Sequence, residues 1–556
     1  MLVSLFFLMF QFCALEHAGT DSYFYHLFFP AIWLKNGYIS RIPIFGFTCE
    51  YYPCYAEMLY AFLMAPLQSA DVAVFLQPIS LFVSCFSLFA LAKEFEIHEK
   101  YALCSFAILS FTSIIVNNAN MAYTDVLNGA ILLNGISVFT LGLRRTDKLL
   151  SICGAVMLGI SSAIKLTGLF LSPLLFLFLI FYYFFENKKT IHCIKWCIPI
   201  AIIVASPCYL ANWIQTGNPF YPVRIPPLFN AGLEFERHAI GFSKDTLSFF
   251  LSNRNWGMNP ASLILWGGLP ISAIFICLMK KNIPFDKKMF FLSYSLVLSV
   301  LAVLQLLFYP AIAEARQFIP WIFAAAPLLL TLSYCTHFSH KKNECLFIFF
   351  LIVLLMFLYK SDMIHAPWTP YWIFFFGGLF TSIIPTRFYL FLGKIILGIL
   401  MLYLPLLFSV RVLELRERGN IYAGEGTSQA IKIIRDYTIQ HPNNNIRINL
   451  TNSLFGYAFL EDMWKNEIIS IPINKKNSSI PHEFSSLAEM RKNPLSDEEW
   501  IHQIHENHVN FVFIGGDISD EERYPNSEYE LGVMNRHPEY FLPLLSEKRT
   551  FLYFVK

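Results

Sequence analysis

Acids, aromatic residues and one histidine follow the first apolar stretch of the chain. Asp21, Tyr25 and His26 come directly after residues 1–15, and Glu57 lies in a later apolar segment. Ionisable groups near a membrane are costly and are usually kept for function. A carboxylate can act as a general base or hold an acceptor, so we predict catalytic roles for Asp21 and Glu57. The alternatives are that Asp21 is a solvated loop acid or helix cap and that Glu57 belongs to a structural ion pair.

Two cations and a further acid stand where apolar helices should begin or end. Lys165 interrupts an apolar run, Arg316 precedes another, and Asp125 starts a third. Arginine binds phosphate through a bidentate fork and lysine binds it as a point charge. Alternatively, Asp125 only stabilises a helix N-terminus and Arg316 pairs with Glu314 or another acid. The predicted substrate-binding residues are His26, Tyr25, Asp125, Lys165, Arg316, Arg237 and Arg254.

The composition is that of a polytopic membrane protein. The chain has 556 residues, of which 56% are hydrophobic and 14% are charged, whereas soluble domains average about 25% charged residues. A membrane-spanning helix needs roughly 20 mostly apolar residues. About thirteen segments of the chain fit, so the predicted fold class is a mainly α helical membrane bundle. These segments lie near residues 1–15, 72–92, 101–117, 124–143, 149–164, 167–185, 194–212, 262–279, 289–309, 318–336, 345–359, 371–384 and 388–410.

The basic residues predict the orientation of this bundle. Cytoplasmic loops are enriched in Lys and Arg. One alternate set of loops holds Lys93, Lys100, Arg144, Arg145, Lys148, Lys188, Lys189, Lys195, Lys280, Lys281, Lys287, Lys288, Lys341, Lys342, Arg387 and Lys394. The other short loops hold only Lys35, Arg41, Lys165, Arg316 and Lys360. The N-terminus is therefore predicted to be cytoplasmic, and the loops 16–71 and 213–261 and the C-terminal tail to face the other side.

A composition change near residue 411 predicts two domains. Residues 1–411 form the membrane domain, and residues 412–556 form a small soluble α/β domain. The short segments rich in Ile, Val and Phe at 447–450, 467–473, 509–514 and 550–555 are predicted strands. The predicted helices are 427–440 and 497–507, and Ser496 with Glu499 forms a capping box at the start of the second.

The cysteines give no metal-site pattern. None of the 12 cysteines forms a CxxC pair with metal-site spacing, so no metal ligands are predicted. Cys49 and Cys54 lie in the first loop. They could pair if that loop faces an oxidising compartment, or they could stay free thiols.

Several short motifs resemble a known family. They are Asp21 with Tyr25-His26-Leu27, Trp33-Leu34, Gly37-Tyr38-Ile39, Tyr52-Pro53, Ala56-Glu57-Met58-Leu59-Tyr60, Asn212-Trp213 and Thr216-Gly217-Asn218-Pro219. Their order resembles that in bacterial membrane glycosyltransferases of the GT-C superfamily, relatives of the aminoarabinose transferases and protein O-mannosyltransferases. The resemblance covers about residues 1–410.

This resemblance implies an inverting hexosyl- or pentosyltransferase of the bacterial inner membrane that serves the cell envelope. Its donor would be a polyprenyl-phosphate sugar, its acceptor a periplasmic or outer-leaflet lipid, glycan or protein, and no nucleic acid would be involved. In this family, an acid in the first outer loop acts as a base or holds an acceptor or metal. Asp21 corresponds to that acid. A divalent cation is possible, although Ser22 stands where relatives often carry a second acid.

Three other classes of protein compete with this interpretation. A flippase or transporter of lipid-linked saccharide would also use intramembrane charges, but it typically shows paired repeats and broken helices, which this sequence lacks. An O-antigen polymerase or ligase has a related organisation but typically relies on Arg-rich outer loops. A membrane scaffold would not need Asp21, Glu57 and Lys165.

Overall fold

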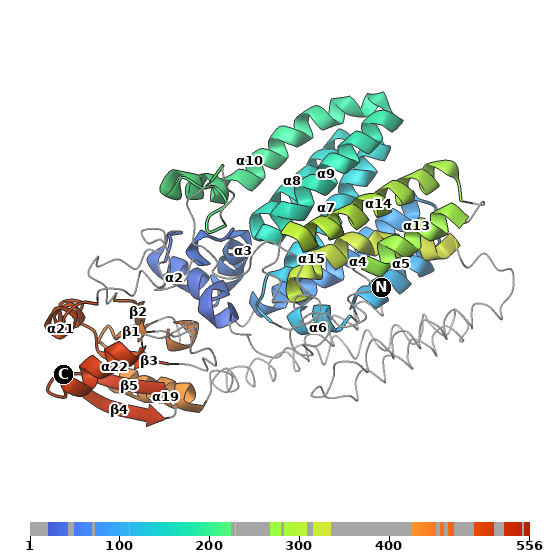
Figure 1. Cartoon of the computed structure of the whole chain (residues 1–556). Helices are drawn as coiled ribbons and strands as arrows, with labels where there is room; N and C mark the ends of the chain where they lie inside the picture. The colour runs from blue at the N-terminus through green and yellow to red at the C-terminus, as the bar shows by residue number, and fades with distance from the viewer. Residues whose placement is uncertain are drawn as a thin grey trace, which may run out of the picture.

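A bundle of apolar helices carries a small mixed-sheet domain at one end (Figure 1). The computed structural model describes residues 21–42, 49–68, 70, 73–110, 112–119, 121–223, 228–229, 267–279, 283–308, 315–334, 425–451, 456–460, 465–471, 494–515, 527–547 and 550–556. Within these residues, 5 helical segments are long and apolar enough to cross a membrane. They are α4 (Leu76–Glu94), α7 (Asp125–Arg144), α9 (Leu166–Glu186), Lys188–Thr216, which comprises η4 (Lys188–Thr190) and α10 (Ile191–Thr216), and Phe285–Leu304 within α14 (Phe285–Phe308).

Shorter helices complete the described bundle. They are η1 (Ser22–His26), α2 (Phe28–Asn36), η2 (Cys49–Tyr51), α3 (Tyr55–Met64), η3 (Ala73–Phe75), α5 (Glu99–Ser110), α6 (Ser113–Ala119), α8 (Lys148–Ile164), α13 (Leu269–Met279), η6 (Ala315–Phe318), α15 (Ile319–Ala325) and η7 (Ala326–Tyr334). The helices predicted at 72–92, 124–143, 149–164, 167–185, 194–212 and 289–309 are found with shifted ends, and α13 occupies the end of the segment predicted at 262–279. The predictions at 1–15, 345–359, 371–384 and 388–410 lie outside the described residues.

Two predicted spans are each divided. The segment 101–117 was predicted as one span but contains α5 and α6, with Thr112 between them. The Thr112 hydroxyl donates to the carbonyl of Ile108 at 2.9 Å, a local bond that competes with helical pairing. The segment 318–336 consists of α15 followed by the tighter 3₁₀ helix η7.

Close packing of α7 against α8 forms the centre of the bundle. A Cβ atom built on Gly154 would lie 2.5 Å from the backbone nitrogen of Phe139, and one on Gly142 would lie 2.4 Å from that of Ser151. Only glycine permits this approach, and small residues are common where membrane helices touch. Buried residues cover most of α7, which places this helix inside the bundle.

A single extended residue separates α8 from α9. Lys165 has φ −156° and ψ 152°, so neither helix continues through it. The sequence predicted a weak break here, and the structure confirms it. This break places the Lys165 side chain beside Asp125, the first residue of α7.

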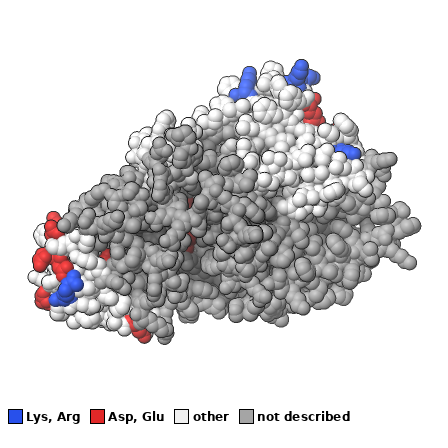
Figure 2. All heavy atoms as spheres, viewed as in Figure 1, with Lys and Arg blue, Asp and Glu red and all other residues white. Residues whose placement is uncertain are grey.

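The opposite ends of the helices carry paired basic residues. Arg144 and Arg145 donate to Glu94 at 3.3 and 2.6 Å, and Lys287 lies 2.7 Å from Glu96. Figure 2 shows Lys and Arg at the helix ends far from the C-terminal domain. Those of the predicted Lys- and Arg-rich loops that the structure describes therefore lie at one end of the bundle.

The C-terminal domain has helices on both faces of a five-stranded sheet with order β2-β1-β3-β5-β4. The parallel strands are β1 (Arg447–Thr451), β2 (Glu467–Ile469) and β3 (Phe511–Ile514), and β5 (Thr550–Val555) runs antiparallel to β3 and β4 (Phe541–Glu547). Buried side chains of α19 (Glu425–Gln440) cover one face, and those of α21 (Asp497–Glu506) and α22 (Ser527–Arg536) cover the other. The Ser496–Glu499 capping box is confirmed. The sequence predicted neither β4 nor α22.

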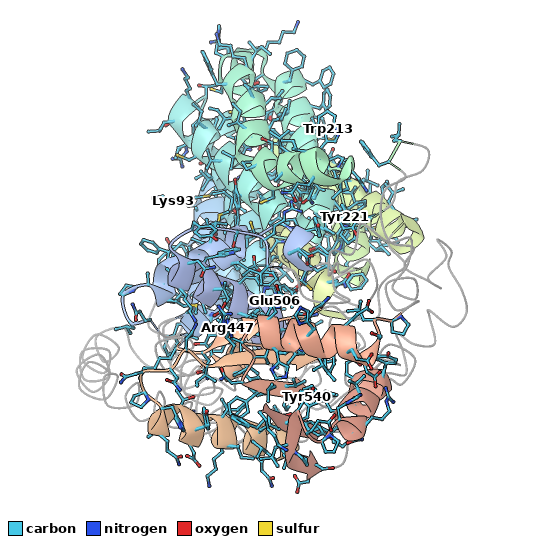
Figure 3. All side chains as sticks on the ribbon, turned by 90° about the vertical axis from the view of Figure 1, so that its left-hand side faces the viewer. Lys93, Trp213, Tyr221, Arg447, Glu506 and Tyr540 are labelled. Atoms are coloured by element: carbon cyan, nitrogen blue, oxygen red, sulfur yellow. The ribbon has the colours of Figure 1, made fainter. Side chains whose placement is uncertain are left out.

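This domain contacts the segment that follows Asp21. The Lys35 ammonium of α2 donates to the Asn466 carbonyl at 2.9 Å, and Leu460 packs into the apolar core that contains Trp33. Figure 3 shows Arg447 on the side of the domain nearest the helices and Tyr540 farther away. The domain therefore packs against the end of the bundle at which Asp21 lies.

Candidate active site

Asp21 is held by an ion pair across the bundle. It precedes η1, and its Oδ2 atom accepts from Nη2 of Arg316 on η6 at 2.5 Å. Burial acts to raise the pKa of Asp21, but the charge of Arg316, with those of His26 and Lys165, lowers it below the usual value of 3.8. Asp21 is therefore a carboxylate at neutral pH. The predicted partner of Arg316 was Glu314 or another acid, and Asp21 is that other acid.

His26 and Glu57 form a second, more deeply buried pair. Nδ1 of His26 on η1 donates to Oε1 of Glu57 on α3 at 2.5 Å. The side chains are only 2% and 5% exposed, so this pair is almost fully buried. The contact also fixes η1 against α3, as the structural ion-pair alternative for Glu57 would require.

Replacing His26 with Ala is expected to destabilise the protein on the order of 3–5 kcal/mol, because it leaves the buried Glu57 charge without its partner. The thermal unfolding of the detergent-purified chain measures this loss. A double variant, His26→Leu with Glu57→Leu, removes both polar groups and should recover much of the lost stability. If the double variant unfolds as early as His26→Ala, the pair is not what stabilises η1 against α3.

Lys165 and Asp125 form the third pair. Nζ of Lys165 donates to Oδ1 of Asp125 at 2.7 Å, and the Asp125 side chain is fully buried. Asp125 is also the first residue of α7, where a negative charge is favourable. Both the proposed binding role and the alternative helix-end role are compatible with this position.

Tyr123 contacts two of these pairs, and Asp125 of the third pair lies two residues after it in the chain. The Arg316 guanidinium lies over its ring at 4.4 Å, and the His26 ring centroid is 6.2 Å from that of Tyr123. Its backbone carbonyl accepts from the hydroxyl of Tyr60 and from the amide of Gln77. The charge of Lys165 also acts on Asp21, so the six charged or titratable side chains form one cluster near Tyr123, a residue that was not predicted as part of the site.

A cavity of about 410 Å³ opens beside this cluster, between the first loop region and the end of α10. Tyr25 and Glu57 line it together with Arg41, Glu50 and Asn212. The aromatic and apolar part of the wall comes from Phe29, Trp33, Tyr52 and Met58. A predicted substrate-binding residue, Tyr25, thus reaches a cavity, whereas Arg41, Glu50 and Asn212 were not predicted as site residues.

Arg41 and Glu50 differ in how they are paired. Nη2 of Arg41 donates to Oδ1 of Asn212 at 2.6 Å, and its guanidinium lies over the Tyr51 ring at 4.2 Å. Both carboxyl oxygens of Glu50 are buried without a hydrogen bond to another described residue. Burial raises the pKa of Glu50 to about 8, although Arg41 acts in the opposite direction. Glu50 is therefore mostly neutral at pH 7, and the two partners described above for Arg41, Asn212 and Tyr51, carry no charge either.

The raised pKa of Glu50 predicts a pH-dependent loss of stability. The folded chain keeps this proton up to about pH 8, while the unfolded chain releases it near the usual value of 4.5. The contribution of Glu50 to the free energy of unfolding therefore falls as the pH rises between these two values, and it is constant above them. Glu50→Gln stays neutral, so its unfolding temperature should rise relative to the natural chain as the pH goes from about 5 to about 8. A pH-independent difference between the two proteins would contradict the raised pKa.

Two predicted binding residues, Arg237 and Arg254, lie outside the described residues. Over the described ranges, no group of three or more His, Cys, Asp or Glu side chains could hold a metal ion. Cys49 and Cys54, predicted either to pair or to remain free, are both free thiols.

The chain is similar in structure to solved membrane proteins. Its fold matches ArnT from Cupriavidus metallidurans bound to undecaprenyl phosphate, with TM-score 0.55 and 12% identity over 99% of this chain and 96% of that one. The chain has the ArnT fold. The apo structure of the same ArnT matches at TM-score 0.54 and 12% identity, over 98% and 95% of the two chains. No protein-family model matches the sequence. No curated protein matches it.

This match confirms the predicted resemblance at the level of the fold. The similarity to ArnT spans both the helical bundle and the C-terminal sheet, because it covers nearly all of both chains. Together with the apolar helices of the bundle, it supports a multi-pass membrane protein with this fold.

Proposed function

We propose that this chain is a membrane glycosyltransferase that moves a sugar from a polyprenyl-phosphate donor to a lipid, glycan or protein acceptor. The observation that carries the proposal is the cluster around Tyr123, where two cations and three acids meet at one end of a bundle. The fold similarity to an ArnT bound to undecaprenyl phosphate supports a donor with a lipid phosphate. A flippase would not need an ionised acid paired with an arginine beside an aromatic-lined cavity.

In the proposed reaction, a hydroxyl oxygen of the acceptor attacks the anomeric carbon of the donor sugar. The bond between that carbon and the phosphate oxygen breaks, and the lipid phosphate leaves with the electron pair. Lys165 and Arg316 stabilise the negative charge on the leaving phosphate, and Asp21 accepts the hydroxyl proton or orients the hydroxyl. Attack opposite to the leaving group inverts the anomeric centre.

Arg316 has to serve two anions in this reaction. It holds Asp21 through Nη2, and the donor phosphate would approach the same guanidinium, whose fork can bind more than one oxygen. Lys165, which is held by Asp125, supplies the second positive charge. The remaining predicted ligands Tyr25, Arg237 and Arg254 would contact the sugar or the phosphate. The buried His26 would hold Glu57 at the cavity wall, where Glu57 would orient the acceptor.

We further propose that the cluster faces the non-cytoplasmic side of a bacterial inner membrane. Asp125 begins α7 at the cluster, whereas Arg144 and Arg145 lie at the other end of this helix, which would be cytoplasmic. The C-terminal domain, proposed to begin near residue 412, contacts the cluster end through Lys35 and would therefore face the periplasm.

The decisive experiment incubates the purified full chain with a panel of polyprenyl-phosphate sugars and envelope lipids, glycans or proteins as acceptors. Release of free lipid phosphate together with a glycosylated acceptor supports the proposal. Activity with nucleotide sugars alone contradicts it. Movement of intact lipid-linked saccharide across vesicles without chemical change would favour a flippase, and joining of preformed glycan chains would favour a polymerase or ligase.

A further inference from the structure

Two cysteine sulfurs meet where the first loop region packs against α10. Sγ of Cys54 lies 3.5 Å from Sγ of Cys208, although the two residues are 154 positions apart in the chain. Cys54 is the residue that caps the start of α3, and Cys208 lies within α10. Both side chains are half-buried and line the 410 Å³ cavity.

The contact between the two sulfurs lies within a longer interface. Val204, Cys208 and Asn212 follow one another at intervals of four, so they share one face of α10. The Val204 carbonyl accepts from the Tyr55 hydroxyl at 2.7 Å, and the Asn212 amide donates to the Tyr51 carbonyl at 2.9 Å. The sulfur contact lies between these two hydrogen bonds, which hold the loop region and α10 in register.

We propose that Cys54 and Cys208 are a redox pair whose disulfide fastens the first loop region to α10 beside the active-site cluster. A disulfide brings sulfurs to about 2.05 Å, so each thiol has to move by less than about 1 Å from the observed contact. Rotation of the two side chains is the motion that would bring the sulfurs together. Disulfides persist in oxidising compartments, and the proposed non-cytoplasmic orientation places both sulfurs in one.

The oxidant is another disulfide, either a small one such as glutathione disulfide or that of a thiol oxidase. The thiolate of one cysteine attacks a sulfur of the oxidant, forms a mixed disulfide and releases one reduced thiol. The thiolate of the second cysteine then attacks the sulfur of the first cysteine in this mixed disulfide. The bond between Cys54 and Cys208 forms, and the second half of the oxidant leaves as a reduced thiol. Two electrons and two protons pass in total from Cys54 and Cys208 to the oxidant.

The bond would restrain the cavity and a residue of the cluster. Glu57 lies three residues after Cys54 on the first turn of α3 and pairs with His26. Cys54, Cys208 and Glu57 all line the cavity, so a covalent link would fix the distance between two of its walls. Reduction would leave the hydrogen bonds of Tyr55 and Asn212 to hold the same interface.

The test treats the purified full chain with glutathione disulfide, blocks free thiols with a maleimide and maps the digested protein by mass spectrometry. The expected product is a peptide pair joined through Cys54 and Cys208, absent from Cys54→Ser and Cys208→Ser and retained in Cys49→Ser. Serine is a favourable residue at the helix-capping position of Cys54, so that variant should fold. Complete labelling of Cys54 and Cys208 after oxidation, or a Cys49–Cys54 link, would overturn the proposal.

A second measurement tests whether the bond restrains the fold. The oxidised natural chain should unfold at a higher temperature than the same protein after reduction, because the crosslink limits the unfolded chain. Cys54→Ser and Cys208→Ser should unfold at the same temperature in both conditions. Equal unfolding temperatures for the oxidised and reduced natural chain would show that the bond fastens nothing. Neither result depends on sugar transfer, so the redox pair and the proposed function can fail separately.

Discussion

Asp21→Asn is expected to lower the rate of sugar transfer about 10²–10⁴-fold, the usual contribution of a general base. Asparagine has nearly the same shape but cannot accept the acceptor's proton, and it carries no charge to hold Arg316. The charge of Arg316 helps to keep the pKa of Asp21 low against the effect of burial, so the natural side chain is ionised and can accept a proton. Initial rates of lipid-phosphate release by the purified variant, at saturating donor, measure the effect.

A matched control is Asp286→Asn. Asp286 also contacts an arginine, with its Oδ2 atom 3.6 Å from Nη2 of Arg144, but it lies at the opposite end of the bundle. This control should transfer sugar at close to the natural rate and should reach the membrane in equal amount. Near-normal transfer by Asp21→Asn would remove Asp21 from the mechanism, whereas loss of the folded protein would show that the ion pair is mainly structural.

The sequence predicted the helical elements better than the small domain. Long apolar runs define α4, α7, α9 and α10, and a lone lysine in such a run was enough to predict the break at Lys165. Strand β4 was missed because Pro543 argues against a strand. The structure resolves this, since β4 is at the edge of the sheet, where proline is tolerated. Helix α22 was missed because Gly532 and its polar residues give it little apolar periodicity.

The site was predicted as separate residues and not as pairs. The chemistry of Asp21, Lys165 and Arg316 is visible in the sequence because charges are rare in apolar surroundings. Their partners are not visible, since Asp21 and Arg316 meet across 295 positions of the chain. Glu50 was not selected as a site residue, because an acid in a loop is ordinary until its burial is known.

Arg316→Gln is expected to lower transfer about 10²–10³-fold, the usual effect of removing one preorganised donor to a developing negative charge. It should also change the pH dependence, which a purely structural role would not do. Without Arg316, the largest influence that lowers the pKa of Asp21 is gone, so burial raises that pKa above its value in the natural chain. Asp21 would be protonated as the pH falls through this higher value, so the variant's remaining activity should decline at weakly acidic pH.

In the natural chain, protonation of Asp21 should not lower the transfer rate until the pH falls below about 4, because the pKa of Asp21 lies under its usual value. Arg316→Lys is the matched control, since it keeps the positive charge and loses the planar fork. It should therefore retain the natural acid limit while its transfer rate stays reduced, because lysine cannot hold Asp21 and a phosphate through one rigid group. Rates measured from about pH 4 to pH 8 for the three proteins separate the two roles of Arg316. An unchanged pH profile in Arg316→Gln would mean that the ionised state of Asp21 is not what the reaction requires.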